Sequence, residues 1–448
     1  MNLKDLAKIS KGKLIGESID VDAFSIDTRT LKPDDTYIAL HGENFDGHDF
    51  IPDALDNEAC AVIVSKPIPQ KIPQIIVSDT YKFLEMVAIN NRKNFEGKLI
   101  GITGTNGKTS TKQIVSNLLE NRGLCHKTIG NKNNQIGVPF TLLSLNSKYD
   151  FSVIEIGTSE PGEIEILSNL IKPDIAAITN VSLGHLDGLR DTNSIAEEKG
   201  NIFNFSTDCG VAILPRDSDY YGFWSDNTNA KEQISFGFHK NSDFRVSNIK
   251  IDIINNTTHF NLSFDDKFES LSINGISQFN ALNAALSVAI GLYCGVSIEE
   301  IRHSLLLTHL PERRLNVSLA QNGSIVIDDS YNSNPASMKN ALDSLEKADG
   351  QKICVLGSMK EMGPKSKEIH KDIYNYATKK ADMIFCMGEE WSGCGKDQNL
   401  IIYEDHDDLY HHLINLIDEN TIILVKGSRS TRMDLIADKL KNNATTTI

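Results

Sequence analysis

The segment at residues 100–111, IGITGTNGKTST, places a glycine-rich turn and a lysine directly after a short apolar run. Residues 99–102 suit a buried strand, and residues 109–119 carry apolar side chains at helical spacing. A strand, a glycine turn and a helix in this order form the context in which backbone N–H groups and a helix N-terminus face an anion. The segment therefore predicts a phosphate-binding loop.

Within this loop, Lys108 supplies a full positive charge, and the Thr109 hydroxyl is suited to hold Mg²⁺. The general phosphate-loop pattern has glycine six residues before the lysine, whereas this chain has Ile102 there and glycines at Gly101 and Gly104. The alternative is a glycine turn between an ordinary strand and helix. We expect nucleotide binding by the residues of the turn and first helical positions: Gly104, Thr105, Asn106, Gly107, Lys108, Thr109 and Ser110.

Length and charge limit the class of protein. A chain of 448 residues with 40% hydrophobic residues suggests about three folded domains. The net charge of −15 argues against a nucleic-acid partner or an anionic membrane surface, because both need clustered Lys and Arg. Seven scattered cysteines without a Cys-x-x-Cys spacing favour a reducing compartment. With no signal-peptide pattern and no long apolar run, we expect a cytoplasmic protein without membrane insertion.

The order of apolar runs divides the chain into three regions, all of the α/β class. Residues 1–97 read as a small α/β module with strands at 36–40 and 61–65 and a helix at 81–95. Residues 98–312 read as a mostly parallel nucleotide-binding sheet, with an antiparallel meander between 244 and 273 as an extension. Residues 313–448 alternate apolar runs and helical stretches, as in a second doubly wound, Rossmann-like domain.

Three residues outside the loop are candidates for metal or phosphoryl chemistry. Glu155 ends an apolar run, where a carboxylate is costly unless it binds a partner such as a hard cation. The alternative, a carboxylate capping the next helix, suits Glu160 or Glu163 better. His185 follows another apolar run, although a lone histidine is usually structural. From its pattern alone, Lys199 is an ordinary solvated lysine on a helix.

A resemblance changes these assignments. The strings GITGTNGKTST, EIGTSEPGEI, TNVSLGHLDG, AEEKGNIF, RRLN and DDSYNSNPASM occur in this order, and together they resemble the Mur ligases, ATP-dependent amide-forming enzymes of peptidoglycan synthesis. GNKNNQIGVPFTLL, LGSMKEMG and VKGSRSTRMD are most similar to the branch of that family that joins D-alanyl-D-alanine to UDP-N-acetylmuramoyl-tripeptide. The likeness covers nearly the whole chain.

The resemblance implies an N-terminal domain that grips the UDP end of the substrate (1–97), a central ATPase (98–312) and a C-terminal domain that closes over the site (313–448). It implies that Asn280 and Asn283 approach adenine, that Arg314 approaches the ATP phosphates and that Asp328 approaches the ribose. The substrate-binding residues implied in the same way are Thr28, Arg29, Asp46, Gly47 and His48 for UDP, Asn134 and Gln135 for the muramoyl peptide, Asn332, Asn334, Lys426, Ser428 and Arg429 for the dipeptide, and Thr158 and Ser159 for a part of the substrate that is not specified. For the UDP segment, an ordinary polar loop is the alternative.

The family also implies that Lys199 is carbamylated by CO₂. A carbamate offers anionic oxygens, unlike an ammonium, and so suits a second Mg²⁺ beside His185. Two Mg²⁺ ions with Lys108 and Arg314 would neutralise the γ-phosphoryl group while a substrate carboxylate attacks it, giving an acyl phosphate that the dipeptide amine converts to an amide. We expect a monomer acting on small molecules.

The chain departs from the family pattern at three places. Gln278 and Phe279 stand before Asn280 where the family has a histidine, Ser358 replaces a common acidic residue, and residues 158–160 differ from the usual polar pair. Two other functions remain as alternatives: a sister ligase that adds a single amino acid, or a phosphate-loop protein that binds nucleotide without forming a bond.

Overall fold

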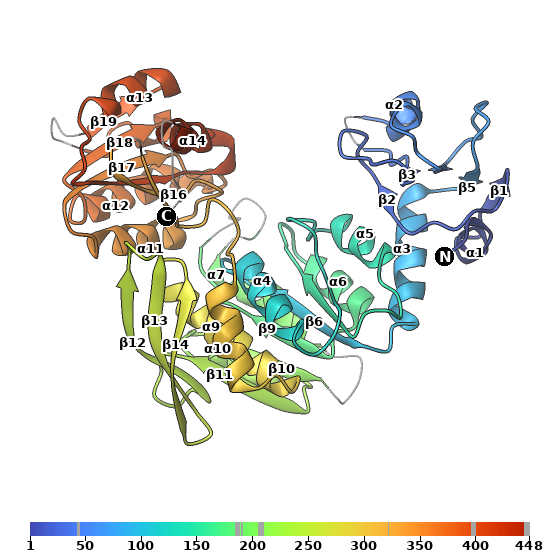
Figure 1. Cartoon of the computed structure of the whole chain (residues 1–448), viewed down its shortest axis with the longest axis horizontal. Helices are drawn as coiled ribbons and strands as arrows, with labels where there is room; N and C mark the ends of the chain where they lie inside the picture. Colours follow the sequence, from blue (N-terminus) through green and yellow to red (C-terminus); the bar gives the residue numbers. More distant parts are fainter. Residues whose placement is uncertain are drawn as a thin grey trace.

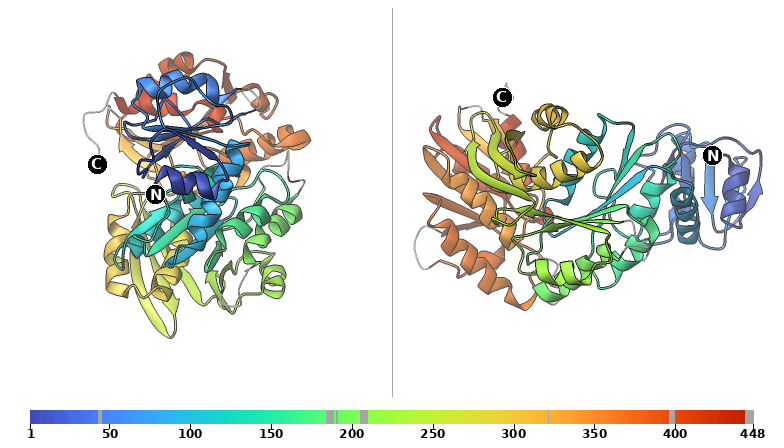
Figure 2. Two further views of the ribbon diagram at one scale, coloured as in Figure 1. Left: turned by 90° about the vertical axis from the view of Figure 1, so that its right-hand side faces the viewer. Right: turned by 90° about the horizontal axis from the view of Figure 1, so that it is seen from below.

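Three sheets divide the protein into three α/β domains, as expected from the sequence. The computed structural model describes residues 1–42, 45–183, 189, 191–204, 210–320, 322–395 and 400–442. The N-terminal and C-terminal sheets lie at opposite ends of the molecule with the central sheet between them (Figures 1 and 2). Across the described ranges, every helix is too short or too polar to cross a bilayer.

The N-terminal sheet has the strand order β1-β5-β4-β3-β2, in which only the β1–β5 pair is antiparallel. Helices α1 and α3 cover one face with a cluster that includes Leu6 and Phe83, and α2 covers the other face. The elements are α1 (Leu3–Ile9), β1 (Lys13–Ile15), β2 (Phe24–Ser25), β3 (Thr36–Ile38), the 3-10 turn η1 (Gly47–Phe50), α2 (Ile51–Asp56), β4 (Ala61–Val64), β5 (Gln74–Ile76) and α3 (Thr80–Lys93).

Helix α3 also joins this domain to the central one. The Asn91 side chain donates to the backbone oxygens of Leu142 and Leu143 at 3.0 and 2.9 Å. These two acceptors lie at the end of the central helix α5 (Gly137–Leu143). Because Asn91 is buried, its amide needs these partners, and they fix the end of α3 on the central domain.

The central sheet is continuous over the order β14-β13-β12-β11-β10-β9-β6-β8-β7. Strands β6 to β12 pair in parallel, and β12, β13 and β14 pair as the expected antiparallel meander. The strands are β6 (Lys98–Thr103), β7 (Cys125–Lys127), β8 (Phe151–Glu155), β9 (Ile175–Ile178), β10 (Val211–Pro215), β11 (Glu232–Gly237), β12 (Phe244–Asp252), β13 (Thr257–Phe264) and β14 (Lys267–Asn274).

Helices cover both faces of the central sheet. The cluster on one face joins Ile100 and Ile102 to α4 and α9, and the cluster on the other face joins Leu99 and Ile154 to α3, α5, α6 and α7. The remaining central elements are α4 (Lys108–Leu119), α6 (Glu163–Ile171), α7 (Thr192–Gly200), η2 (Asn201–Phe203), α8 (Tyr221–Asn227), α9 (Gln278–Tyr293) and α10 (Ile298–Leu307).

The C-terminal sheet has the order β15-β16-β20-β17-β18-β19, parallel except for β15, with α11 and α12 on one face and α13 and α14 on the other. This is the expected doubly wound arrangement. The elements are β15 (Asn316–Leu319), β16 (Ile325–Asp329), α11 (Pro335–Glu346), β17 (Gln351–Gly357), η3 (Gly363–Lys365), α12 (Ser366–Ala377), β18 (Met383–Met387), η4 (Glu389–Trp391), β19 (Leu400–Tyr403), α13 (His406–Ile414), β20 (Thr421–Lys426), η5 (Arg429–Thr431) and α14 (Asp434–Asn442).

In the central sheet, β6 lies between β8 and β9, so the carboxyl ends of three parallel strands meet at one edge. Ligands of open α/β sheets bind outside this edge, where the strand order reverses. The candidate residues Glu155, Lys108 and Thr109 all follow these strands or begin the helix after them.

Candidate active site

The turn between β6 and α4 has the backbone conformation that only glycine adopts without strain. Gly104 has φ +147°, and a Cβ there would lie 1.9 Å from the Thr179 hydroxyl oxygen. Gly107 has φ +83°, and a Cβ there would lie 2.7 Å from the Asn283 side-chain oxygen. The two glycines therefore let the turn pack tightly against the end of β9 and against α9.

Lys108 closes the turn. Its Nζ donates to the backbone oxygens of Gly104 at 2.7 Å and Thr105 at 3.2 Å. Burial lowers the pKa of Lys108, the charge of Glu155 acts in the opposite direction, and Arg314 lowers it further. Lys108 and the turn line a cavity of about 540 Å³, a size common for small-molecule sites.

Asn180 holds the turn from the neighbouring strand end. Its side-chain oxygen accepts from the Asn106 backbone N–H at 3.1 Å, and its amide group donates to the Asn106 backbone oxygen at 2.9 Å. The Thr179 hydroxyl donates to the same oxygen at 2.6 Å. These bonds leave the Asn106 side chain to point toward the C-terminal domain.

Glu155 ends β8 beside α4 and is only 1% exposed. Its Oε1 accepts from the Thr109 hydroxyl at 3.2 Å and from the Asn133 side-chain amide at 2.7 Å. The Lys112 Nζ lies 3.2 Å from Oε2, yet this contact lacks hydrogen-bond geometry, so Oε2 has no hydrogen-bond partner among the described residues. A buried carboxylate oxygen without a hydrogen bond, beside a hydroxyl, fits a hard cation such as Mg²⁺.

The described ranges contain no cluster of three His, Cys, Asp or Glu side chains suited to a metal. His185, the other expected metal ligand, lies outside the described residues.

Lys199 is buried on α7 and is 3% exposed, which overturns its interpretation as a solvated surface lysine. Burial places its pKa well below the ordinary value; the positive charge of Lys108 acts in the same direction, and the neighbouring Glu198 acts against it. Among the described residues, no hydrogen bond or ion pair to the Lys199 amine is formed.

On α9, Asn280, Asn283 and Phe279 line the cavity. The Asn280 side-chain nitrogen is buried without a hydrogen-bond partner among the described residues. An unsatisfied amide donor facing a cavity fits a ligand acceptor such as a ring nitrogen. Phe279 contributes an aromatic side chain to the same cavity.

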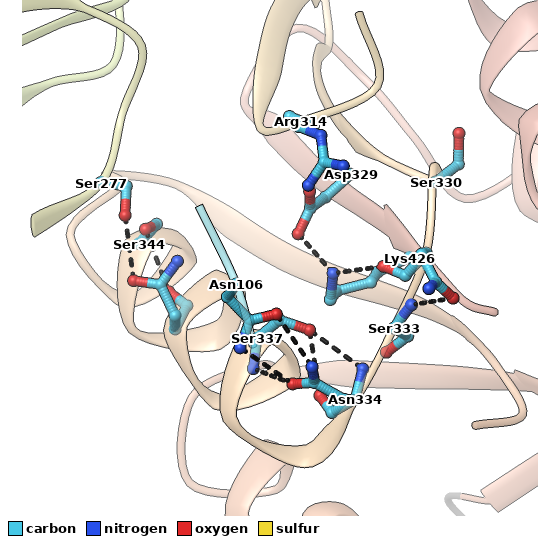
Figure 3. Close-up of polar contacts among 12 residues, drawn as sticks. Asn106, Ser277, Arg314, Asp329, Ser330, Ser333, Asn334, Ser337, Ser344 and Lys426 are labelled. Atoms are coloured by element: carbon cyan, nitrogen blue, oxygen red, sulfur yellow. Dashed lines mark hydrogen bonds and ion pairs between the residues drawn. The ribbon is translucent and has the colours of Figure 1, made fainter. Parts of the chain in front are cut away.

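The C-terminal domain completes the cavity with Arg314, Asp329 and Lys426 (Figure 3). The Lys426 Nζ donates to Asp329 Oδ2 at 2.6 Å and to the Asn332 backbone oxygen at 2.9 Å. Burial raises the pKa of Asp329, and the charge of Lys426 opposes this effect. The Arg314 guanidinium lies 4.4 Å from the centre of the Tyr331 ring.

Asp328 lies elsewhere, although the resemblance implied that it approaches the ribose. It is fully buried, accepts from the Ser330 N–H at 3.0 Å and hydroxyl at 2.6 Å, and pairs with Lys441 of α14. Of these two adjacent carboxylates, Asp329 is the one that lines the cavity.

The central and C-terminal domains meet through the turn itself. The Asn334 amide donates to the Asn106 side-chain oxygen at 2.8 Å, and the reverse bond measures 3.4 Å (Figure 3). The Ser277 hydroxyl donates to the Asn340 side-chain oxygen at 3.0 Å. Helix α11, which Asn334 caps, is thereby placed against the phosphate-binding turn.

A second cavity of about 360 Å³ adjoins Asn334. It brings together Asn332, Asn334, Ser428 and Arg429 of the expected dipeptide-binding set and adds Lys360. Lys360 is paired with Glu390, whereas Arg429 is exposed and stands 5.8 Å from the centre of the Tyr331 ring.

Four further residues expected to bind substrate lie on loops near the first cavity. Asn134, Thr158 and Ser159 line it. Gln135 is not among the lining residues, and its amide lies 3.4 Å from Glu163. Ser110 of the turn also lines the cavity.

The expected UDP-binding residues form a separate group in the N-terminal domain. His48 accepts from the Ser65 N–H at its Nε2 (2.9 Å), so its Nδ1–H faces Asp46 Oδ1 at 2.6 Å. Gly47 lies within the same short helical turn, and Arg29 pairs with Asp27 at 2.7 Å. The Thr28 backbone oxygen accepts from Asn57 at 3.2 Å.

Several residues of the site were missed by sequence reasoning. Lys112 lies one helical turn after Lys108, and that spacing is the signal that could have placed it on the same face. Asn133, Asp329, Tyr331 and Asn340 gave no local signal, because tertiary packing brings them to the cavity.

Comparisons with known proteins follow the same division of the chain. Residues 20–93 match a model described as Mur ligase family, catalytic domain; residues 102–291 match the Mur ligase middle domain; residues 313–429 match the Mur ligase, glutamate ligase domain.

Relatives and solved structures extend over almost the full length. A UDP-N-acetylmuramoyl-tripeptide--D-alanyl-D-alanine ligase of Buchnera aphidicola is 35% identical over 98% of both chains. The crystal structure of MurF from Acinetobacter baumannii has a TM-score of 0.87 at 29% identity and covers 98% of both chains. MurF of Thermotoga maritima in complex with ADP has a TM-score of 0.82 at 26% identity, covering 94% of this chain and 98% of the other.

Proposed function

Because the chain belongs to the Mur ligase family, we propose that it joins D-alanyl-D-alanine to UDP-N-acetylmuramoyl-tripeptide with hydrolysis of ATP to ADP, producing the UDP-pentapeptide precursor of peptidoglycan. The observation that carries this proposal is the cavity of about 540 Å³, to which a phosphate-binding turn and the C-terminal domain both contribute. A binding module would need only the turn, whereas a ligase must hold two further substrates beside the γ-phosphate.

We assign one substrate to each domain. Residues 1–97 would hold the UDP end through Thr28, Arg29 and the Asp46-Gly47-His48 turn. Residues 98–312 would hold ATP, and residues 313–448 would hold the dipeptide in the second cavity. Its exposed Arg429 is suited to the dipeptide carboxylate, since a guanidinium pairs with a carboxylate through two hydrogen bonds.

For ATP, the backbone of residues 104–110 and the Lys108 ammonium would bind the phosphates, and Arg314 would reach them from the C-terminal domain. Asn280 and Asn283 would bind adenine beside the Phe279 ring. Asp329, which lines the cavity, would contact the ribose in place of Asp328.

Thr109 and Glu155 would hold Mg²⁺, and we expect His185 to join a second ion. Bound Mg²⁺ would neutralise charge on the phosphate oxygens. Lys108 and Arg314 contribute to the same end with fixed positive charges, so that a substrate carboxylate can approach the γ-phosphoryl group.

We also propose that the neutral Lys199 amine adds to the carbon of CO₂ and releases a proton to solvent, giving a carbamate. Its burial and its lack of a counter-ion among the described residues both favour the neutral amine, which is the form that reacts. The carbamate oxygens would then orient the metal-binding groups.

The bond changes follow from these positions. The peptide carboxylate attacks the γ-phosphorus and ADP leaves, giving an acyl phosphate. The dipeptide amine attacks the acyl carbon, and the tetrahedral intermediate loses phosphate to leave the amide. The protein supplies no nucleophile in either step; it orients the substrates and excludes water.

The test is phosphate release from Mg-ATP with UDP-N-acetylmuramoyl-tripeptide, with and without D-alanyl-D-alanine, while the UDP product is followed by mass. We expect release only with both substrates and a product heavier by one dipeptide. Coupling of a single amino acid would move the protein to a sister ligase. ATP turnover independent of both substrates would contradict a ligase.

A further inference from the structure

Glu198 and Lys199 are adjacent on α7, and both are buried, at 5% and 3% exposure. Consecutive residues on an α-helix point about 100° apart, so these two side chains face different neighbours. Glu198 faces the beginning of α6, where it accepts from the Gly162 and Ile164 N–H groups, and Lys199 does not share these partners. The Glu198 carboxylate is thus bound by α6 and not by the adjacent lysine.

Both Glu198 carboxylate oxygens are occupied by α6. Oε2 accepts from the Gly162 N–H at 2.7 Å, and Oε1 accepts from the Ile164 N–H at 2.8 Å. The first N–H groups of a helix have no partner within the helix, and an anion there is also favoured by the helix dipole. The carboxylate therefore binds α7 to the N-terminus of α6 through two charge-assisted hydrogen bonds.

The same carboxylate reaches the loop that follows the Glu155 strand. The Thr158 hydroxyl, which lies at the cavity, is 3.4 Å from Glu198 Oε1. Two residues earlier in α7, the Ala196 backbone oxygen accepts from the Trp224 indole N–H at 2.9 Å. The helix is thus held on two sides, by α8 through Trp224 and by α6 through Glu198.

We propose that Glu198 is a positioning residue: by binding the beginning of α6 and the Thr158 hydroxyl at the cavity, it fixes the turn of α7 that carries Lys199. The inference rests on the proposed carbamate function of Lys199. Its chemical content is that the N–H groups of α6 occupy the Glu198 carboxylate, so α7 keeps one position and the Lys199 side chain reacts with CO₂ from a fixed place.

The experiment compares two adjacent glutamates. Glu198→Gln keeps the side-chain shape but replaces one acceptor oxygen with a donor group that faces an N–H. Glu197→Gln removes the same charge from the same helix at an exposed position, and serves as the matched control. Thermal unfolding of each variant checks that the protein is folded.

The readout is the carbamate itself, observed by ¹³C NMR in full-length protein titrated with ¹³C-bicarbonate, with Lys199→Ala identifying the resonance. We expect Glu198→Gln to need roughly 10- to 100-fold more bicarbonate for half occupancy, the usual effect of losing a residue that orients a ligand. Its kcat should fall and recover with added bicarbonate, at unchanged KM for the UDP substrate. Glu197→Gln should match the wild type.

Wild-type bicarbonate dependence in folded Glu198→Gln protein would overturn the inference, as would a loss of kcat that bicarbonate does not restore. If the wild type gave no resonance that Lys199→Ala removes, the proposed role of Lys199 would fail and this inference with it. Dipeptide-dependent phosphate release in the wild type would still stand in that case, so the two failures are distinguishable.

Discussion

At the scale of single residues, the site is built from charged side chains whose partners come from a neighbouring helix or strand or from the phosphate-binding turn. Glu155 has Lys112 beside it, Asp329 has Lys426, and Lys108 is held by backbone oxygens. Charges so held are already desolvated, and their interactions with a substrate are stronger than in water. Because each of these charges has a defined partner, the effect of replacing it can be interpreted.

Replacing Lys108 should remove phosphate stabilisation without unfolding the protein, since its amine bonds only to its own turn. We expect Lys108→Met to lower kcat by roughly 100- to 1000-fold, the usual effect of losing one group that stabilises transition-state charge. Steady-state phosphate release measures this. Lys127→Met, at a partly exposed position away from the cavity, should leave kcat unchanged.

His126 predicts an acid-sensitive component of stability. Burial lowers its pKa from 6.5 to about 4 in the folded protein, and its ring contacts the Ser152 and Ser144 hydroxyls, both at 3.0 Å. Below pH 6.5 the unfolded chain binds a proton that the folded protein does not, so stability is full above that pH and falls as the pH drops toward 4. The difference corresponds to roughly 3 kcal/mol.

Urea unfolding at several pH values measures this loss. His126→Gln has no such titration, and its unfolding free energy should depend less on pH between 6.5 and 4 than that of the wild type. Equal pH dependence of the two proteins would contradict the assignment.

The sequence alone does not determine which of the two adjacent carboxylates, Asp328 or Asp329, faces the cavity. Successive side chains of a strand point to opposite faces, so only one of two adjacent carboxylates can face the cavity. Both faces of the C-terminal sheet are covered by helices, and the apolar pattern therefore does not distinguish them. Which carboxylate faces the cavity depends on the position of α14, because α14 supplies Lys441 as the partner of Asp328.

At the scale of elements, the sequence predicts those helices and strands whose apolar residues recur with a clear local period. The strand, turn and helix of the phosphate-binding loop, the meander and the alternating C-terminal units are all present. Short strands such as β1, β2 and β7, each two or three residues long, were missed because they are too short to show a period. The burial of Lys199 was missed because it depends on α6 and α8 packing around α7.

Helix α11 carries the contact between the two larger domains, and Asn334 has two roles there. It caps the helix by accepting from the Ser337 N–H at 2.9 Å, and it bonds to Asn106 of the phosphate-binding turn. Asn334→Ser keeps a good capping residue but is too short to reach Asn106. We expect unchanged thermal stability and a KM for ATP raised roughly 2- to 10-fold, the value of one hydrogen bond.

The companion variant Asn334→Ala separates the two roles. It loses the cap as well, so its stability should fall by about 1 kcal/mol relative to Asn334→Ser. A wild-type KM for ATP in Asn334→Ser would show that the bond between the domains does not affect nucleotide binding.

At the scale of the whole molecule, the proposed UDP-binding group and the ATP cavity belong to sheets at different positions along the long axis (Figure 1). A substrate that joins them must draw the N-terminal domain toward the other two. We expect small-angle scattering to give a smaller radius of gyration when an ATP analogue and the UDP substrate are added together. The analogue alone should have less effect, and no compaction with both would contradict domain closure.

The pairing of Asp328 with Lys441 has a practical consequence for shortened versions of the protein. Lys441 lies in the last turn of α14, while Asp328 stands in the strand directly before the cavity residue Asp329. A truncation before Lys441 would leave a fully buried carboxylate without its cation, at a cost of about 3 to 5 kcal/mol. The last turn of α14 therefore supports the strand that carries the cavity residue Asp329. An affinity tag should be added after this turn and should not replace it.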